Sequence, residues 1–164
     1  MTHHRLNKIV NDILNKYNEM GHFENTNIIH QCLDELAEHS TCGLLHTSSV
    51  LVSSKGKFLA GGINVSLQKN YNYIPGFCEK MKPRDGNKPG FCHAIHAEHL
   101  MFSDAFRKKV DIPSTTVFSL YAPCLQCAKL ITAFEINNVF YYKEFYSDEG
   151  VSFLRLNMIL IKKI

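Results

Sequence analysis

Two short stretches of the sequence hold residues that can bind a metal ion and move a proton. The first holds His96 and Glu98 with one residue between them, and the second holds Pro123, Cys124 and Cys127. Imidazole nitrogen and thiolate sulfur are zinc ligands, and three protein ligands with an open fourth position are typical of catalytic zinc. The pattern therefore predicts a catalytic zinc site with His96, Cys124 and Cys127 as the ligands.

The spacing places both stretches at the starts of helices. Cysteines three residues apart share one face of a helix, so both sulfurs can reach one ion. Pro123 suits the beginning of a helix because its missing N–H would have no partner there. The positive end of a helix lowers the pKa of a thiol, so Cys124 and Cys127 are expected to favour the thiolate form that binds metal.

Glu98 is the expected proton carrier of this site. It lies too close in sequence to His96 to occupy the same metal position, but it can hydrogen-bond a water on the ion. Zinc can lower the pKa of such a water to about 7. Glu98 would take the proton from the water and deliver it to the substrate. Alone, a C-x-x-C pair can also be a redox pair or half of a structural zinc site, which would not need Glu98.

The composition is that of a globular protein. The 164 residues are 45% hydrophobic and 20% charged, which suits one domain over residues 1–164 with an additional helix at 1–20. No apolar run is long enough to span a membrane, and no signal peptide is recognisable, so a cytoplasmic protein with reduced cysteines is expected. The net charge of +3 is too small to indicate nucleic-acid binding by itself.

Apolar periodicity and turn residues predict an alternation of helices and strands. Helices are expected at 4–19, 26–39, 95–106, 124–136 and 149–156, and strands at 47–52, 57–64, 115–120, 139–142 and 158–161. The first helix either packs on its own domain or contacts another subunit. Strands that alternate with helices require crossover connections, so the expected fold is a three-layer α/β/α arrangement around a five-stranded mixed sheet.

A long segment from residue 65 to 92 carries aromatic and basic side chains between its prolines and glycines. A segment of this length is usually functional or disordered. Its aromatic and cationic residues suit a nucleotide through stacking and phosphate contacts, although a solvated loop remains the alternative. These residues are Tyr71, Tyr73, Phe77 and Phe91, with Lys69, Lys80, Lys82, Arg84 and Lys88.

The two metal-binding stretches match the signature of zinc-dependent nucleobase deaminases. Over residues 28–161 the chain resembles the cytidine deaminase superfamily, and within it the deoxycytidylate (dCMP) deaminases. The similarity is carried by the segment from Ala122 to Ile131, by the segment from Tyr146 to Glu149, and by the hairpin that ends at Asn64.

The resemblance implies zinc as cofactor, a cytidine-deaminase-like fold with the last two strands parallel, and further roles for single residues. By position, Asn64 would contact the sugar or base, the backbone of Ala97 and the carbonyl of Ala122 would bind the pyrimidine edge, and Tyr146 would also contact substrate. A second, structural zinc, as some phage-type relatives have, could use Cys42, Cys78, Cys92 and His93; the alternative is that these thiols bind no metal.

The sequence departs from the dCMP deaminases at several positions. The family's Gly-Tyr-Asn-Gly-x-Pro is replaced by residues 62–67, the usual Asn is Leu100, and the Val-Gly-Ala of the first strand is Thr-Ser-Ser from residue 47. The expected reaction is hydrolytic deamination of a cytosine nucleotide, dCMP to dUMP and ammonia, by a homo-oligomer. Deamination of free cytidine or deoxycytidine, or of single-stranded nucleic acid or tRNA, is the alternative, and a folding-only zinc module is a third.

Overall fold

The computed structural model describes residues 3–21, 26–66, 94–145 and 147–164. Five helices and seven strands lie in these ranges. The helices are α1 (His3–Met20), α2 (Thr26–Ala37), α3 (Ala97–Arg107), α4 (Leu125–Ala133) and α5 (Glu149–Leu156). The strands are β1 (Ser48–Ser53), β2 (Phe58–Ile63), β3 (Val65–Ser66), β4 (Ala94–Ile95), β5 (Thr115–Tyr121), β6 (Asn138–Lys143) and β7 (Leu160–Lys163).

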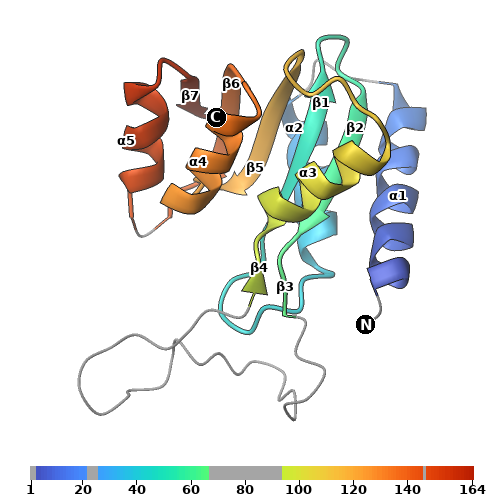
Figure 1. Ribbon diagram of the computed structural model, residues 1–164. Helices are drawn as coiled ribbons and strands as arrows, with labels where there is room; N and C mark the ends of the chain where they lie inside the picture. Colours follow the sequence, from blue (N-terminus) through green and yellow to red (C-terminus); the bar gives the residue numbers. More distant parts are fainter. Residues whose placement is uncertain (1–2, 22–25, 67–93, 146) are drawn as a thin grey trace, which may run out of the picture.

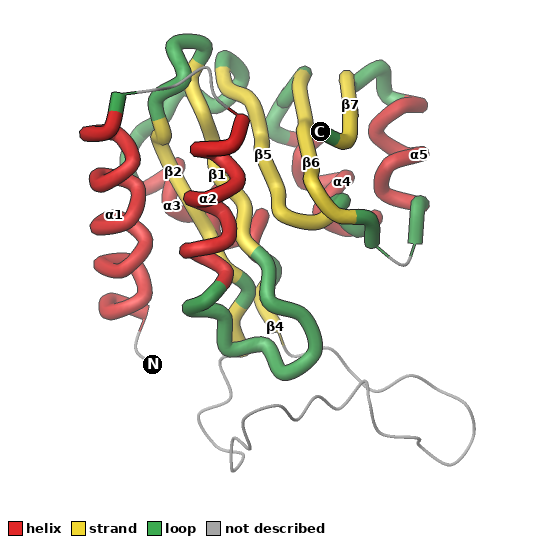
Figure 2. The backbone as a smooth tube through the Cα atoms, turned by 180° about the vertical axis from the view of Figure 1, so that it is seen from behind, coloured by secondary structure: helices red, strands yellow, loops and turns green. Residues whose placement is uncertain are grey.

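Five of the strands form one mixed sheet in the order β2-β1-β5-β6-β7. The first three are antiparallel neighbours, whereas β5, β6 and β7 run parallel. Figure 1 shows α3, α4 and α5 on one face of the sheet, and Figure 2 shows α1 and α2 on the other. The predicted three-layer α/β/α fold with a five-stranded mixed sheet and parallel last strands is therefore confirmed.

The sheet separates two apolar cores, one for each helical layer. Val50 and Val52 of β1 face the core under α1 and α2, and Leu51 between them faces the core under α3, α4 and α5. All three are almost completely buried. Because successive side chains of a strand point to opposite faces, a strand covered on both sides is mostly apolar along its length. None of the described helices has the length and apolar character needed to cross a membrane.

Five predicted boundaries are wrong by more than a residue, and two of them are the end of the second helix, at Ala37, and the end of the last strand, at Lys163. Ile95 lies in β4 instead of a helix, because β4 pairs with β3 before the chain turns into α3. The fourth helix ends at Ala133, three residues early, because Glu135 takes the left-handed conformation that terminates helices. The last strand begins at Leu160, since Met158 is also left-handed and forms a turn.

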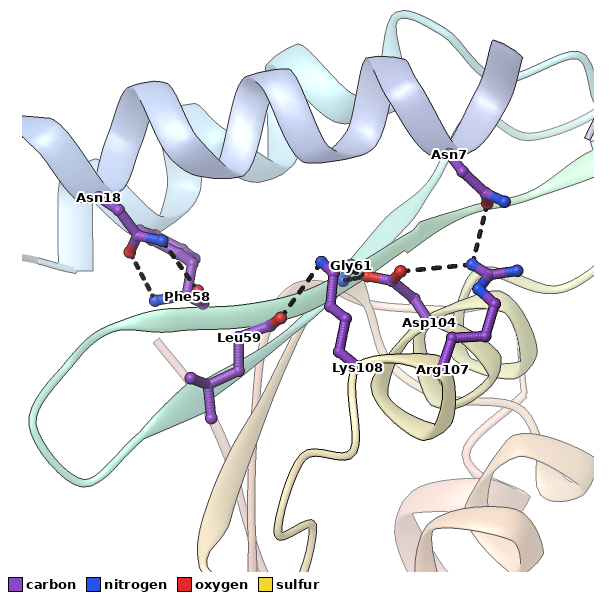
Figure 3. A network of polar contacts seen from close by, with 8 residues as sticks. All are labelled: Asn7, Asn18, Phe58, Leu59, Gly61, Asp104, Arg107 and Lys108. Carbon is purple, nitrogen blue, oxygen red and sulfur yellow. Dashed lines mark hydrogen bonds and ion pairs between the residues drawn. The ribbon is translucent and has the colours of Figure 1, made fainter. Parts of the chain in front are cut away.

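The outer edge of β2 is covered by polar side chains from α1 and α3 (Figure 3). The Asn18 amide donates to the carbonyl oxygen of Phe58 at 2.9 Å and accepts from its N–H at 2.9 Å. Buried Asp104 accepts a hydrogen bond from the Gly61 N–H at 3.2 Å and pairs with Lys108 at 2.7 Å. These contacts fix α1 and α3 to the same edge strand.

Candidate active site

The three predicted metal ligands meet where the N-termini of α3 and α4 approach each other. His96 and Cys124 are the N-cap residues of these helices, both with extended backbone, and Cys127 lies in the first turn of α4. His96 Nδ1 is 3.3 Å from the Cys127 sulfur and 3.5 Å from the Cys124 sulfur. Donors around one tetrahedral zinc ion lie about 3.6 Å apart, so this arrangement fits zinc.

His99 is a fourth potential donor that the motif did not predict. Its ligand atom lies within 4.8 Å of those of His96 and Cys127. The signal was present in the sequence, because residues three apart share a helix face and His99 follows His96 by three. Unlike His96, the His99 side chain is exposed.

Glu98 is buried beside the metal ligands. The Cys127 sulfur donates to Glu98 Oε2 at 3.2 Å. Burial raises the pKa of the Glu98 carboxyl above its usual range, and hydrogen bonds to the carboxylate partly oppose this effect. A carboxyl group whose pKa is moved toward neutrality can both accept and release a proton, as general acid–base catalysis requires.

The two thiols form a coupled pair. A hydrogen bond from Cys127 is the main cause that lowers the pKa of Cys124 to about 3, with burial opposing it and His96 assisting. The same bond raises the pKa of Cys127, and burial adds to this rise. Cys124 is therefore the thiolate of the pair, the form in which cysteine binds metal.

A cavity of about 510 Å³ opens next to the metal ligands. Its volume is within the usual range for small-molecule sites. His96, Glu98 and Cys124 line it together with mostly apolar neighbours. The remaining lining residues in the described part of the chain are Cys42, Leu44, Leu45, Thr47, Asn64, Ala94, Tyr121, Ala122, Gln126, Glu144 and Phe145.

Asn64 lines this cavity, but its side-chain amide is already engaged with the protein. Its oxygen accepts hydrogen bonds from the Ser40 hydroxyl at 2.6 Å and the Thr47 N–H at 3.0 Å, and its nitrogen donates to the Leu45 carbonyl. The amide thus holds the loop that precedes β1. Since Leu45 and Thr47 also line the cavity, Asn64 shapes the cavity wall.

The other three predicted substrate contacts, Ala122, Ala97 and Tyr146, differ in where the structure places them. Ala122 lines the cavity and uses its N–H in a hydrogen bond to the Lys143 carbonyl at 2.9 Å. Ala97 is fully buried at the start of α3 and does not line the cavity. Tyr146 lies outside the described residues.

The predicted second zinc site involves mostly residues that the structure does not describe. Cys42 is a buried free thiol that lines the cavity. Cys78, Cys92 and His93 lie outside the described residues, and so does the basic segment from Lys69 to Lys88. The second zinc site and the basic phosphate-binding segment therefore remain predictions.

The family described as the cytidine and deoxycytidylate deaminase zinc-binding region matches residues 24–143, which is well over half of the chain. This chain belongs to that family. The deaminase region contains all three predicted zinc ligands and Glu98, and α1 precedes it. No curated protein sequence matches the deaminase.

Solved structures support the fold of this deaminase. The dCMP deaminase of cyanophage S-TIM5, in complex with dCMP and dUMP, matches with a TM-score of 0.69 at 19% identity, covering 85% of this chain and 96% of that one. The Rib2 deaminase of Aspergillus oryzae matches with a TM-score of 0.56 at 14% identity, covering 85% of this chain and 84% of that one.

A third match is a diaminohydroxyphosphoribosylaminopyrimidine deaminase/5-amino-6-(5-phosphoribosylamino)uracil reductase from Thermotoga maritima. It has a TM-score of 0.57 at 20% identity, with 81% of this chain and 34% of that chain covered. At these identities the likeness concerns the fold. The family assignment makes the protein a zinc-dependent hydrolytic deaminase.

Proposed function

We propose that this protein deaminates a cytosine nucleotide, converting dCMP to dUMP and ammonia, with zinc held by His96, Cys124 and Cys127. The observation that carries this proposal is the meeting of these three donors and Glu98 beside a cavity of about 510 Å³. The likeness in fold to a cyanophage dCMP deaminase in complex with dCMP and dUMP supports the choice of nucleotide.

Water first adds across the double bond between C4 and the ring nitrogen N3 of cytosine, and the bond from C4 to the amino nitrogen then breaks. A C–O bond forms, the C–N bond breaks, and ammonia leaves. Zinc held by His96, Cys124 and Cys127 would supply Lewis acidity that lowers the pKa of the attacking water. Glu98 takes the proton released by the water, passes it to the ring nitrogen, and then assists protonation of the departing amino group.

The cavity walls are suited to the base and the sugar. Leu45, Tyr121 and Phe145 provide apolar surface, and Ala122 brings backbone close to the ring. Tyr121 lies under Lys143, whose nitrogen is 5.7 Å from the ring centre. A cation over this ring helps to hold it in place at the cavity wall.

Free deoxycytidine or cytidine is the second candidate substrate. Among the described lining residues there is no lysine or arginine, and Glu144 adds a carboxylate. A phosphate would therefore depend on cations from elsewhere, for which the segment from Lys69 to Lys88 is the candidate. Without that contribution, the described lining would favour the nucleoside over the nucleotide.

A substrate comparison tests the proposal. Ammonia release should be measured with dCMP, deoxycytidine, cytidine and single-stranded DNA as substrates. Each charge-assisted hydrogen bond to phosphate contributes about 1.5–3 kcal/mol, so kcat/KM for dCMP should exceed that for deoxycytidine at least about tenfold. Equal efficiency on both would assign a nucleoside deaminase, and activity on the strand alone would assign a polynucleotide deaminase.

The variant Glu98→Gln tests the role of Glu98 as proton carrier in the same assay. The amide keeps the size of the side chain but cannot carry the proton, so kcat should fall by about 10²–10⁴-fold while zinc content is unchanged. Turnover close to that of the wild type would rule out Glu98 as the proton carrier. Lys129→Gln, an exposed change in α4 away from the described cavity lining, should retain turnover and controls for a nonspecific effect of substitution in this helix.

A further inference from the structure

At two glycines, Gly62 and Gly150, the backbone of one element is in close contact with the backbone next to a proposed metal ligand. A Cβ atom at Gly150 of α5 would overlap the Pro123 carbonyl oxygen and would lie 2.8 Å from the Cys124 carbonyl carbon. A Cβ atom at Gly62 of β2 would overlap the Ala97 carbonyl oxygen and the Met101 nitrogen. Neither neighbour is the movable end of a side chain, so neither can yield cheaply.

The adjacent Gly61 provides the contrast. A Cβ atom there would meet side-chain methyl groups of α1, at 3.1 Å from Val10 Cγ1 and 3.3 Å from Leu14 Cδ1. Rotation of these side chains can relieve such contacts. Glycine is therefore strictly required at Gly62 and Gly150, which contact backbone near the metal site, and less strictly at Gly61, which contacts side chains of α1.

The position of Cys124 depends on its neighbours more than that of Cys127 does. Cys124 is the N-cap of α4 with extended dihedral angles, φ −70° and ψ 168°, so the helical repeat does not determine its side-chain direction. Cys127 lies inside α4 and is completely buried. A shift of the Pro123–Cys124 peptide would therefore move one sulfur relative to the other.

We propose that Gly150 is a positioning residue of the zinc site, with Gly62 in the same role on the histidine side. By its close contact with the Pro123–Cys124 peptide, Gly150 lets α5 set the position of the Cys124 sulfur, although α5 contributes no ligand. Gly62 in the same way lets β2 set the start of α3, where His96 and Glu98 lie. The inference rests on the zinc ligands proposed above.

Zinc affinity of Gly150→Ala, measured by competition with a chromogenic chelator, tests this proposal. Loss of groups that orient metal ligands typically weakens affinity about 10–100-fold, and we expect a change of this size. Helix propensity alone predicts that Gly150→Ala stabilises α5, because alanine is a better helix former than glycine, and it predicts no loss of zinc affinity. Cobalt substitution gives a second readout, because displaced Cys124 should reduce the thiolate-to-cobalt charge-transfer absorption per bound cobalt.

Val151→Ala is the matched control in the same helix. Val151 is buried in the core under α5, so the change should lower the melting temperature without altering zinc affinity or the cobalt spectrum. If Gly150→Ala binds zinc as tightly as the wild type, or if Val151→Ala weakens zinc binding equally, the proposal is overturned.

The Gly62→Ala and Gly61→Ala pair provides a second test, which decides the proposal if Gly150→Ala does not fold. Only Gly62→Ala should weaken zinc binding, and equal effects of the two would overturn the role of glycine. Because both readouts use metal without substrate, they do not depend on which nucleotide the enzyme deaminates. A wild-type chain that binds no zinc would overturn the ligand assignment as well.

Discussion

At the residue scale, two side chains compete for the third ligand position beside His96 and Cys127. Cys124 has a sulfur 3.5 Å from His96 Nδ1 and a pKa lowered to about 3. His99 is exposed, and its nitrogen lies within 4.8 Å of the donor atoms of the other two. Because the Cys124 thiol already favours the metal-binding thiolate form and lies 3.5 Å from His96 Nδ1, Cys124 is favoured as the third ligand.

Single substitutions separate these assignments. Cys124→Ala should weaken zinc binding by more than about 100-fold, because it removes a ligand and not only a supporting contact. His99→Ala should leave zinc affinity within a factor of about three. Both variants can be titrated against the same chelator at pH 7. The reverse pattern, with loss only in His99→Ala, would assign His99 as the ligand.

The motif predicted the donors and Glu98, but it could not predict what surrounds them. The resemblance predicts a substrate contact for Asn64, and the structure adds that its amide holds residues 40–47 through contacts about 20 positions away in sequence. The substrate contact remains a prediction. Likewise, the unusual Ser48 and Ser49 of β1 are satisfied inside the protein, by the Leu33 carbonyl at 2.6 Å and the Ser119 hydroxyl at 2.8 Å. Such partners are determined by tertiary structure.

At the element scale, α3 is held by one buried carboxylate at its C-terminal end. Asp104 is 4% exposed and contacts the Gly61 N–H, Arg107 and Lys108. Asp104→Ala should lower the free energy of unfolding by about 2 kcal/mol, because hydrogen bonds to a charged group contribute about 1.5–3 kcal/mol. Urea denaturation measures this change. Asp111→Ala, at an exposed aspartate, should change stability by less than about 0.5 kcal/mol.

The contact between α1 and α2 should depend on pH. A hydrogen bond from Lys16 at 2.7 Å, assisted by Tyr17 at 2.9 Å, holds the pKa of Glu35 below its usual value. Since the folded pKa is the lower one, this contribution is complete above the unfolded pKa of about 4.3 and is lost as the pH falls through the folded pKa.

Glu35→Gln should therefore destabilise the protein by about 0.5–1 kcal/mol at pH 7, a small value because Lys16 is largely exposed. The difference from the wild type should shrink as the pH is lowered from 7 toward 3. Urea denaturation at both pH values, with a chelator present throughout, removes the pH dependence of metal binding. A difference that stays constant with pH would mean that the charge of Glu35 does not matter.

Helix and strand order followed from periodicity, whereas the ends of elements did not. The apolar runs were sufficient to predict the order in sequence of the five helices and the five strands of the large sheet. Both faces of this sheet are covered, so its strands and helices all carry strong apolar patterns. The secondary structure at Ile95 depends on the pairing of β3 with β4, and that at Met158 depends on a turn with left-handed backbone. Both are consequences of contacts between segments, so a single stretch of sequence carries little signal for them.

At the scale of the whole molecule, the proposed zinc site connects two segments of the chain that are separated in sequence by α3 and β5. His96 lies at the start of α3 and the cysteines lie at the start of α4, with β5 between these two helices in sequence. Zinc that binds only the folded chain stabilises it by about 2.7 kcal/mol at 100 times its Kd. Zinc addition to chelated protein should therefore raise the melting temperature by about 5–10 °C. Cys127→Ala, which lacks a ligand, should show no such rise.

The covered edge of β2 bears on how copies of this protein can meet. Asn18 offers Phe58 one donor and one acceptor, as the backbone of an added strand would, and Asp104 and Lys108 engage Gly61 and Leu59 further along. A strand from another molecule would have to displace these contacts before it could pair. Side-by-side growth of sheets into fibres needs two pairing edges on every molecule, and here one of them is already terminated from within.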